Sequence, residues 1–436
     1  MSNDYFRDWG FSQAPFQQTA IAPDATGKTL LVGRDDEMRR LSMLLHSYPT
    51  ITCIEGPNGV GKTSLVNVAS FTAFDEYYRT KTGQLLIPCV KAFQLDIDKG
   101  PDEFKFEVLL SVAQSLIRAA DWIPDIRRYS DFSGTLKKLL NDAEVGGTSF
   151  SIADWFSFGK ESAPNESKAF ETSGLEKLIT DWLKHVFPTP DRGGVVCLID
   201  NLEVINESKQ AKTILEKLRD SVLTMPGLRW VICGANGIVS TAVSSPRLDG
   251  FLGEPMRIDG VSLQNARHVL ESRRAAFARP ELVSSPYLPI TDERFETLYL
   301  ALNRNLRHTL GEVSNYCMHV ATNGSHPESD SEKNAMLDGW FSRRVHQLRE
   351  DVEAAVTPRA WKVFDLAARD LNGSFSPSEF TKFGFESQPA LRAHVGTLEE
   401  NGLVVTTRED SDKRLKTVVV TSKGWLVNYA RVLAGK

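Results

Sequence analysis

The nine residues 56–64 constrain this chain more than any other feature of its sequence. The first eight of them, residues 56–63, fit the pattern G-x-x-x-x-G-K-[ST], whose fixed positions would coincide by chance in a chain of 436 residues with a probability of only about 0.02. The segment follows an apolar, β-branched run and precedes a helical stretch, which is the context of a phosphate-binding loop. Glycines let backbone N–H groups converge on phosphate oxygens, and the start of a helix adds partial positive charge. The residues of this predicted nucleotide site are Gly56, Pro57, Asn58, Gly59, Val60, Gly61, Lys62, Thr63 and Ser64.

Two side chains of this loop have a chemical role that follows from their type. Lys62 can reach the β- and γ-phosphates, and Thr63 offers a hydroxyl ligand to Mg²⁺. A second Mg²⁺ contact must come from a carboxylate at the end of a neighbouring strand. Asp200 follows the apolar run VVCLI and supplies it. The sequence therefore predicts ATP and Mg²⁺ as cofactors, with Thr63 and Asp200 holding the metal.

The residues after Asp200 bear on hydrolysis, because the attacking water must be oriented and polarised. Asn201 occupies the position directly after Asp200. An amide can position water but cannot take a proton, so the sequence predicts an ATPase with slow turnover. Glu203 lies three residues after Asp200 and can substitute as the catalytic carboxylate; a surface carboxylate is the alternative interpretation.

Three further polar side chains are candidates for sensing the nucleotide. Asn236 follows the apolar run 229–233, so we predict that it points toward the γ-phosphate; an ordinary turn residue is the alternative. Arg307 begins a helical stretch and can reach across to the phosphates, with a surface arginine as the alternative. Arg247, within the segment SSPRL, is a candidate arginine offered to the nucleotide of a neighbouring subunit.

Short apolar runs alternate with helical segments over the first 260 residues. The runs end near residues 55, 95, 199 and 233, and helices are predicted over 103–120 and 175–187. Continuous apolar strands alternating with helices predict an α/β fold, in which a parallel sheet is covered by helices on both faces. The Gly/Ser- and aromatic-rich segment 146–168 is predicted to be an insertion. It is either a hairpin packed on its own domain or an exposed aromatic loop for a partner.

The length predicts two or three domains. A polar stretch at 321–334 marks a loop between them, and proline-containing helix starts follow at Thr357 and Ser376. The predicted division is an N-terminal extension 1–30, an ATPase core 31–258, a helical lid 259–322, a linker with a connecting helix 323–356 and a C-terminal domain 357–436.

In this order the motifs resemble those of the AAA+ superfamily. Within it, they look like the replication-initiator clade of origin-recognition and Cdc6 type and the related STAND-type ATPases. The resemblance covers roughly residues 15–320 and is carried by the segments 32–41, 56–64, 195–203, 232–236 and 304–310. It implies that Gly33 and Arg34 lie near the adenine and that Arg307 is the second sensor. Asn201 and the long stretch between Gly56 and Asp200 depart from the usual pattern.

The last 80 residues read as three helical segments followed by two strands. Residues 398–424 resemble winged-helix domains of the MarR type, which implies a third helix in the major groove and a wing against the phosphates. The implied DNA contacts are Arg392, Arg408, Lys413 and Arg414. Glu399, Glu400 and the acidic residues of the wing tip favour the alternative, a protein-docking module.

The charge distribution limits how such a module can bind DNA. The whole chain carries a formal charge of −5, but residues 357–436 hold 12 basic and 9 acidic side chains. The C-terminal part therefore has the positive net charge that DNA binding needs, but the excess of basic side chains is small. Useful affinity would therefore require several copies or a partner, and we predict an ATP-dependent homo-oligomer.

Two hypotheses for function follow from the sequence. The first is an ATP-binding switch that, in its ATP·Mg²⁺ form, assembles on DNA or with a partner protein through its winged-helix domain, and is reset by slow hydrolysis. The alternative is a nucleotide-gated scaffold or regulator, of the transposition or anti-phage type, that recruits an effector protein without binding DNA. A start without a signal-like layout, no apolar run of 18 residues and five scattered cysteines predict a cytoplasmic protein without membrane contact.

Overall fold

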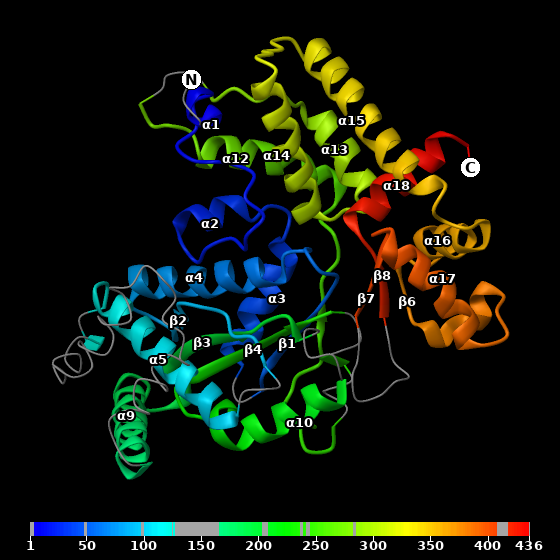
Figure 1. Ribbon diagram of the computed structural model, residues 1–436. Coiled ribbons are helices and arrows are strands. Elements are labelled where there is room, and N and C mark those ends of the chain that lie inside the picture. Colours follow the sequence, from blue (N-terminus) through cyan, green and yellow to red (C-terminus); the bar gives the residue numbers. More distant parts are fainter. Residues whose placement is uncertain are drawn as a thin grey trace.

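The predicted parallel sheet forms the centre of the first part of the chain in the computed structural model (Figure 1). The structure describes residues 4–47, 50–96, 100–123, 125–126, 165–202, 208–235, 239–240, 245–281, 285–407 and 417–435. Five strands pair in the order β2-β3-β4-β1-β5, and every pairing is parallel. The strands are β1 (Thr52–Glu55), β2 (Leu85–Pro88), β3 (Gly193–Ile199), β4 (Leu228–Gly234) and β5 (Met256–Arg257). The predicted α/β fold class is confirmed.

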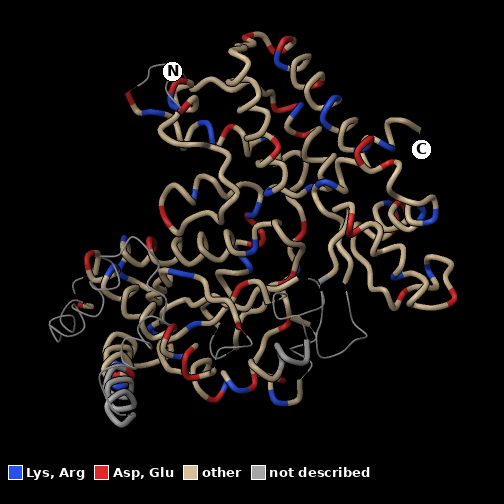
Figure 2. The backbone as a smooth tube through the Cα atoms, in the orientation of Figure 1, with Lys and Arg blue, Asp and Glu red and all other residues tan. Residues whose placement is uncertain are grey.

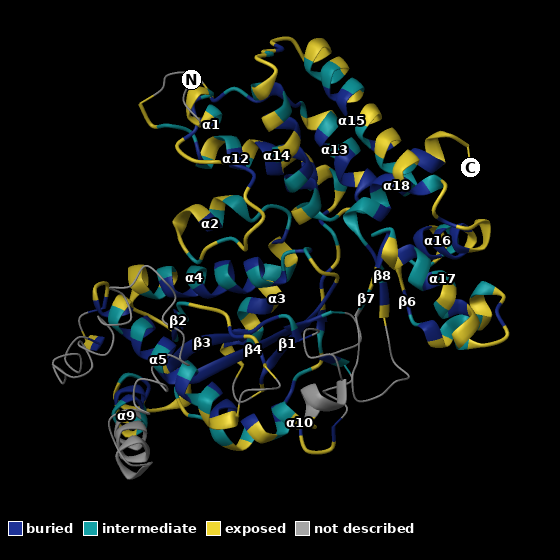
Figure 3. Cartoon of the chain, viewed as in Figure 1, coloured by how far each residue is buried: buried dark blue, intermediate teal, exposed yellow. Residues whose placement is uncertain are grey.

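Helices cover both faces of this sheet, as predicted from its uninterrupted apolar strands (Figures 1 and 3). Alternate residues of a strand point to opposite faces, and accordingly Cys53 packs into one core while Ile54 packs into the other. The helices packed on the Ile54 face are α3 (Asp35–His46) and α4 (Lys62–Thr80). Those on the Cys53 face are α5 (Pro101–Ala120), α9 (Asn165–Val186), α10 (Ser208–Leu218) and the π-helical turn η3 (Arg219–Leu223).

Two predicted elements differ in extent from those observed. The apolar run 85–95 forms a strand only over β2, after which the chain turns and Phe93 makes an isolated bridge with Ile199. The helix predicted over 175–187 begins earlier, because α9 starts at Asn165, and a single 3₁₀ turn η1 (Pro190–Arg192) then leads into β3. The insertion predicted at 146–168 lies almost wholly outside the described residues.

A second hydrophobic core holds the helices that follow the sheet. It contains residues from α12 (Leu263–Ala276), α13 (Asp292–Ala301), α14 (Leu306–Thr322) and α15 (Asp330–Glu353). Both ends of the chain contribute to it. Phe6 from α1 (Tyr5–Asp8), together with Phe11 and Phe16, packs there, and so does Leu426 from α18 (Ser422–Leu433). The predicted division into domains stays a prediction.

The C-terminal module has its own core and its own three-stranded sheet, in the order β6-β8-β7. Its helical segments are α16 (Pro358–Asp370), η4 (Pro377–Phe383) and α17 (Gln388–Glu400), and its strands are β6 (Ser374–Phe375), β7 (Val404–Thr407) and β8 (Thr417–Val420). The helix starts predicted at Thr357 and Ser376 are both present: Thr357 caps α16, and Ser376 with Glu379 forms a capping box at η4. Helix α18, which returns to the lid, was not predicted.

None of the helices in the described ranges is long and apolar enough to cross a bilayer. All five cysteines lie within those ranges as thiols, and four of them are buried. Cys53, Cys197 and Cys233 pack among the apolar side chains of the two cores that flank the sheet.

Candidate nucleotide site

The phosphate loop connects the carboxyl end of β1 to the first turn of α4. Gly59 and Gly61 have φ values of 78° and 101°, a backbone region that side chains other than glycine rarely adopt. Gly56 also has no room for a side chain, because a Cβ there would lie 2.3 Å from the carbonyl oxygen of Ile258. Gly61 is the N-cap of α4, so the first N–H groups of this 19-residue helix have no intrahelical acceptor. The loop therefore presents backbone donors at a helix N-terminus.

Lys62 is held inside this loop by the loop's own backbone. Its Nζ donates to the carbonyl oxygens of Gly56 at 2.9 Å and Pro57 at 3.2 Å, and the residue is only 5% exposed. Within the part of the chain that the structure describes, no carboxylate forms an ion pair with it. A buried ammonium bonded only to carbonyl dipoles is well prepared to receive an anion.

Thr63 and Asp200 meet although they lie far apart in the sequence. The Thr63 hydroxyl donates to Asp200 Oδ2 at 2.5 Å, and Asp200 is 7% exposed at the end of β3. The Asn201 N–H donates to the other carboxylate oxygen at 2.9 Å, with Asn201 in a left-handed conformation at φ 54°. The structure thus brings together the two predicted Mg²⁺ ligands. The described residues contain no cluster of three or more His, Cys, Asp or Glu side chains, so an ion here would need phosphate and water oxygens to complete its shell.

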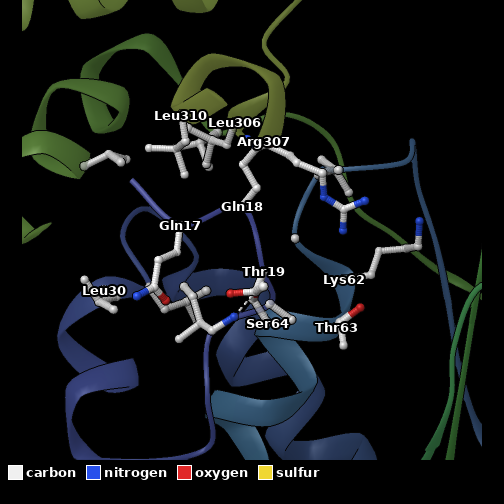
Figure 4. A pocket seen from close by; sticks show the side chains of 18 of the residues that line it. Gln17, Gln18, Thr19, Leu30, Lys62, Thr63, Ser64, Leu306, Arg307 and Leu310 are labelled. Carbon is white, nitrogen blue, oxygen red and sulfur yellow. Dashed lines mark hydrogen bonds between the residues drawn. The ribbon is translucent and has the colours of Figure 1, made fainter. Parts of the chain in front are cut away.

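An open cavity extends from this loop to α12 and α14, the helices of the predicted lid (Figure 4). Its walls come from five parts of the chain: the N-terminal segment 17–21, residues 30–34, the phosphate loop, the end of β3 and the predicted lid. The N-terminal segment is fixed beside α4, because the Ile21 N–H donates to Ser64 Oγ at 3.0 Å and Asn67 Nδ2 donates to the Ile21 carbonyl at 2.9 Å. Away from the loop the lining is apolar, and it includes Leu30, Leu31, Val32, Val269, Leu306 and Leu310. The polar loop and apolar far end match the two halves of a nucleotide.

Gly33 and Arg34, which the AAA+ resemblance places near the adenine, lie at the join between core and lid. Arg34 lines the cavity and is buried. Its guanidinium donates to the carbonyl oxygens of Val60 at 3.0 Å and Asp259 at 2.6 Å, and it pairs with Glu37 at 2.6 Å. Gly33 packs so closely against α12 that a Cβ would lie 2.5 Å from that of Asn265. Arg34 therefore ties the phosphate loop to the segment that leads into the lid.

Arg307 reaches the cavity from the second position of α14 (Figure 4). It stands on the lid side, opposite Thr63 and Ser64. The preceding N-cap residue, Asn305, contacts the loop directly, because its Nδ2 donates to the Asn58 carbonyl at 2.8 Å. Sequence reasoning did not find Asn305, since an N-cap asparagine has no local feature that marks such a contact.

Arg273 is another cavity residue that the motifs did not indicate. It comes from α12, is buried, and donates from Nη1 to the Pro15 carbonyl at 2.6 Å. Burial lowers the pKa of this guanidinium to about 10. Arg273 lies four residues after Val269, another cavity residue, and therefore on the same face of the helix. This spacing is the sequence feature that could have indicated Arg273.

The other site residues predicted from the sequence either do not line the cavity or lie outside the residues that the structure describes. Arg247 is 63% exposed, lies 3.4 Å from Asp220, and does not line the cavity. Arg392 lies half-buried on α17. Five predicted site residues fall outside the described ranges: Glu203, Asn236, Arg408, Lys413 and Arg414.

Glu55 is a buried carboxylate that precedes the loop directly and that the motifs did not single out. Its two oxygens accept from the N–H and the hydroxyl of Ser240, at 2.6 and 2.8 Å. Residue 240 follows the segment that contains Asn236. Glu55 therefore connects the base of the phosphate loop to the chain just beyond the predicted γ-phosphate sensor.

Comparisons with known proteins give structural likeness alone. No family model matches the sequence. No curated protein matches it either. One similar solved structure is the ORC2 protein of Aeropyrum pernix in ADPNP–ADP complexes. The two sequences are 9% identical, the match covers 97% of this chain and 100% of that chain, and the TM-score is 0.46. The A. pernix ORC1 protein in complex with DNA shows 12% identity, 93% and 94% coverage and a TM-score of 0.43. Cdc6p of Pyrobaculum aerophilum shows 13% identity, 99% and 97% coverage and a TM-score of 0.37.

Proposed function

We propose that this chain binds ATP with Mg²⁺ and acts as a nucleotide-dependent switch of the AAA+ type. One observation carries the proposal: the phosphate loop, Asp200 and the lid residue Arg307 line a single cavity, although they come from three distant parts of the sequence. A ligand that contacts all three would set the position of the lid relative to the sheet.

The side chains around the cavity fit this ligand. The loop amides and Lys62 would bind the phosphates, and the bound metal would neutralise phosphate charge. Thr63 and Asp200, already 2.5 Å apart, would share that metal. Arg307 would contact the phosphates only when the lid is closed, as expected of a sensor. The apolar wall formed by Leu30, Leu306 and the residues between them would take the base.

We propose that hydrolysis is slow and serves to reset the switch. The Asn201 N–H is used to hold Asp200, and its side chain has no base that can take a proton from water. Glu203 and Asn236 remain the proposed catalytic carboxylate and γ-phosphate sensor. A slow step suits a device whose bound state must persist while it assembles.

For the C-terminal module we propose a winged helix that contacts DNA. Three helical segments followed by the β7–β8 hairpin support this assignment, with Arg392 on α17 and Arg408, Lys413 and Arg414 between the two strands. Glu399 bears on the alternative, a protein-docking role. Its Oε1 accepts from the Thr406 N–H at 2.6 Å, so this carboxylate serves the hairpin and is not simply a charge offered to a partner.

We further propose that the ATP form assembles into homo-oligomers in the cytoplasm. Arg247 remains the proposed arginine that one copy would offer to the nucleotide of its neighbour; its 63% exposure and its absence from the lining of its own cavity support this. Weak charge on each module makes assembly on DNA dependent on several copies.

Substitution of the loop lysine tests the nucleotide site. We expect Lys62→Ala to lower ATP affinity by about 100-fold or more, since charge-assisted bonds to phosphate are lost from a buried position. Lys28→Ala is the matched control, because Lys28 forms an ion pair with Asp75 on the outer side of α4 and does not line the cavity. Its ATP affinity should stay within about twofold of wild type. Retained ATP binding by Lys62→Ala would overturn the proposal.

The two functional hypotheses differ in what ATP promotes. We would measure the native mass of the full chain and the anisotropy of a labelled DNA duplex, with ATP, with ADP and without nucleotide. The DNA-binding switch predicts ATP-dependent anisotropy that falls as salt rises. A rise in mass with ATP but no DNA binding at any salt concentration would instead support the scaffold that recruits an effector.

A further inference from the structure

We propose that the turn at residues 302–305 transmits nucleotide occupancy from the phosphate loop to the C-terminal module, through the side chains of Asn305 and Asn303. This inference deepens the proposed function and rests on it, because it assumes that the loop binds phosphates. It names the side chains through which that binding would be felt outside the cavity.

The first contact joins the turn to the loop at a peptide group that a phosphate can also engage. Asn305 Nδ2 donates to the Asn58 carbonyl at 2.8 Å. The Asn58 carbonyl and the Gly59 N–H belong to the same planar peptide unit, so an anion bonded to that N–H fixes the direction of the carbonyl. It also polarises the unit and makes the carbonyl a better acceptor. Phosphate binding at Gly59 would thereby strengthen the hold on Asn305.

Gly59 makes this approach possible. A Cβ at Gly59 would lie 2.6 Å from Asn305 Oδ1, which is closer than such atoms approach. Asn305 Oδ1 in turn accepts from the His308 N–H at 3.2 Å and caps α14. One side chain therefore binds the loop with its amide nitrogen and the lid helix with its oxygen.

The turn itself is held in an uncommon backbone conformation. Asn303 and Arg304 have φ values of 53° and 58°, so two consecutive residues with side chains occupy the left-handed region. Such residues are uncommon and persist only where neighbouring contacts hold them. The backbone of this turn is held by its own hydrogen bonds, such as that from the Arg304 N–H to the Tyr299 carbonyl at 2.8 Å, and the side chains of Asn305 and Asn303 make the contacts that lead away from it on either side.

The second contact joins the turn to the C-terminal module. Asn303 Nδ2 donates to Asn372 Oδ1 at 3.0 Å. Asn372 lies in the connection between α16 and β6, and it also has a positive φ, at 50°. The next residue, Gly373, accepts from the Val420 N–H at 2.8 Å, so the contact arrives at the edge of the sheet that carries the β7–β8 hairpin. The path thus runs from the phosphate loop to the base of the predicted wing.

Hydrogen exchange of the full chain, with and without ATP·Mg²⁺, measures this transmission directly. The amides of Gly373 and Ser374 donate to the carbonyls of Ala367 and Leu371, so their exchange reports on the α16–β6 turn. We expect ATP to slow their exchange by about two- to tenfold, the range that one further ordered hydrogen bond supplies. ATP affinity is measured in parallel on the same samples.

Two sets of variants separate the contacts. Asn305→Ser keeps an oxygen that can cap α14 but cannot reach Asn58. Asn303→Asp and Asn372→Asp each leave one amide, which can turn to donate to the new carboxylate, whereas the double variant sets two carboxylates against each other. The control pair Asn323→Asp and Asn401→Asp makes the same charge change, once in the lid and once in the module, away from the turn.

The expected result is that Asn305→Ser and the double variant N303D/N372D lose the ATP-dependent protection at residues 373–374, while each single aspartate variant and the control pair keep it. Protection that survives in both Asn305→Ser and the double variant would overturn the relay. The relay would also be overturned if the wild-type chain bound ATP without any protection of these amides. The proposed nucleotide site would still stand in that case. If wild type does not bind ATP at all, the proposed function fails instead.

Discussion

The nucleotide cavity and the C-terminal module hold their charged side chains in opposite ways. In the cavity, Lys62, Asp200 and Arg34 are buried, and each is held by backbone groups or by a partner from another element. In the module, charges such as Lys382 and Arg369 lie at the surface in ion pairs with near neighbours in the sequence, and the buried Arg431, which pairs with Asp365 of α16, is an exception. Figure 2 shows basic and acidic segments mixed along α16 and α17.

This difference explains why the nucleotide site has a recognisable sequence pattern and the predicted DNA contacts of the C-terminal module do not. A phosphate is bound by backbone groups at fixed positions, so the loop must have glycines at a fixed spacing, and burial makes each polar partner necessary. Recognition of a polyanion by a surface depends on the sum of many exposed charges, which has no required spacing in the sequence. Substitutions in the two regions should therefore differ in the size and the kind of their effects.

The largest effect on stability is expected from Arg34. Arg34→Met removes donors from the Val60 and Asp259 carbonyls and leaves Glu37 without its partner. We expect the free energy of unfolding to fall by about 3 kcal/mol, because buried acceptors then lack a donor. Arg39→Met on the same helix is the matched control. Arg39 is 72% exposed and pairs only with Asp36, so its loss should cost about 0.5 kcal/mol or less. Urea unfolding of both variants makes the comparison, and equal losses would contradict it.

The next effect concerns Asp200 and the metal. Asp200→Asn keeps an acceptor for Thr63 but removes the charge that would attract Mg²⁺. Wild type should bind ATP more tightly with Mg²⁺ than with EDTA, and the variant should lose about 10- to 100-fold of that gain while its affinity in EDTA changes little. Calorimetric titrations under both conditions measure the difference. An undiminished Mg²⁺ effect would place the metal elsewhere.

The sequence predicted most of the sheet and the centre of the site because both are encoded locally. Apolar runs marked the strands, and the glycine spacing marked the loop. Helix α18 was also within reach, since Thr421 caps it and Leu426, Val427 and Ala430 repeat at helical spacing. It was missed because the apolar strand runs directly into its first turn.

Other parts of the site could not be predicted, because they exist only after folding. Arg273 and the N-terminal segment 17–21 line the cavity through contacts between residues more than 40 positions apart, such as Ile21 with Ser64 and Arg273 with Pro15. Asn305 likewise gains its role from its distance to Asn58 and not from its neighbours in the chain. Local patterns identify what a segment can form, while these contacts depend on where the lid comes to rest on the core.

The third prediction tests the exposed region. Replacing Arg408, Lys413 and Arg414 by alanine should weaken duplex binding by about tenfold near 100 mM salt and reduce the salt dependence of the logarithm of affinity by about 3, one for each lost phosphate contact. Neutralising Glu409, Asp410 and Asp412 instead changes the charge by the same amount in the opposite direction and should strengthen binding. Anisotropy titrations over a salt series measure both. Unchanged binding in the basic-to-alanine variant would reject the role of these three side chains in DNA contact.

The smallest expected effect is a pH dependence of the free energy of unfolding, to which His308 of α14 and His394 of α17 contribute to different extents. Burial lowers the pKa of His308, and the adjacent Arg307 lowers it further, against the opposing charge of Glu312. Burial and Arg359 likewise lower the pKa of His394 on α17, which is less deeply buried. Because each folded-state pKa lies below the ordinary value of 6.5, the unfolded chain takes up protons first as pH falls. These histidines therefore leave stability unchanged above pH 6.5 and reduce it as pH falls from 6.5 toward the folded-state pKa. Unfolding titrations across pH 5–8 should show a smaller fall in the free energy of unfolding at acid pH in His308→Gln than in His394→Gln. The opposite order would show that folding shifts the pKa of His394 more than that of His308.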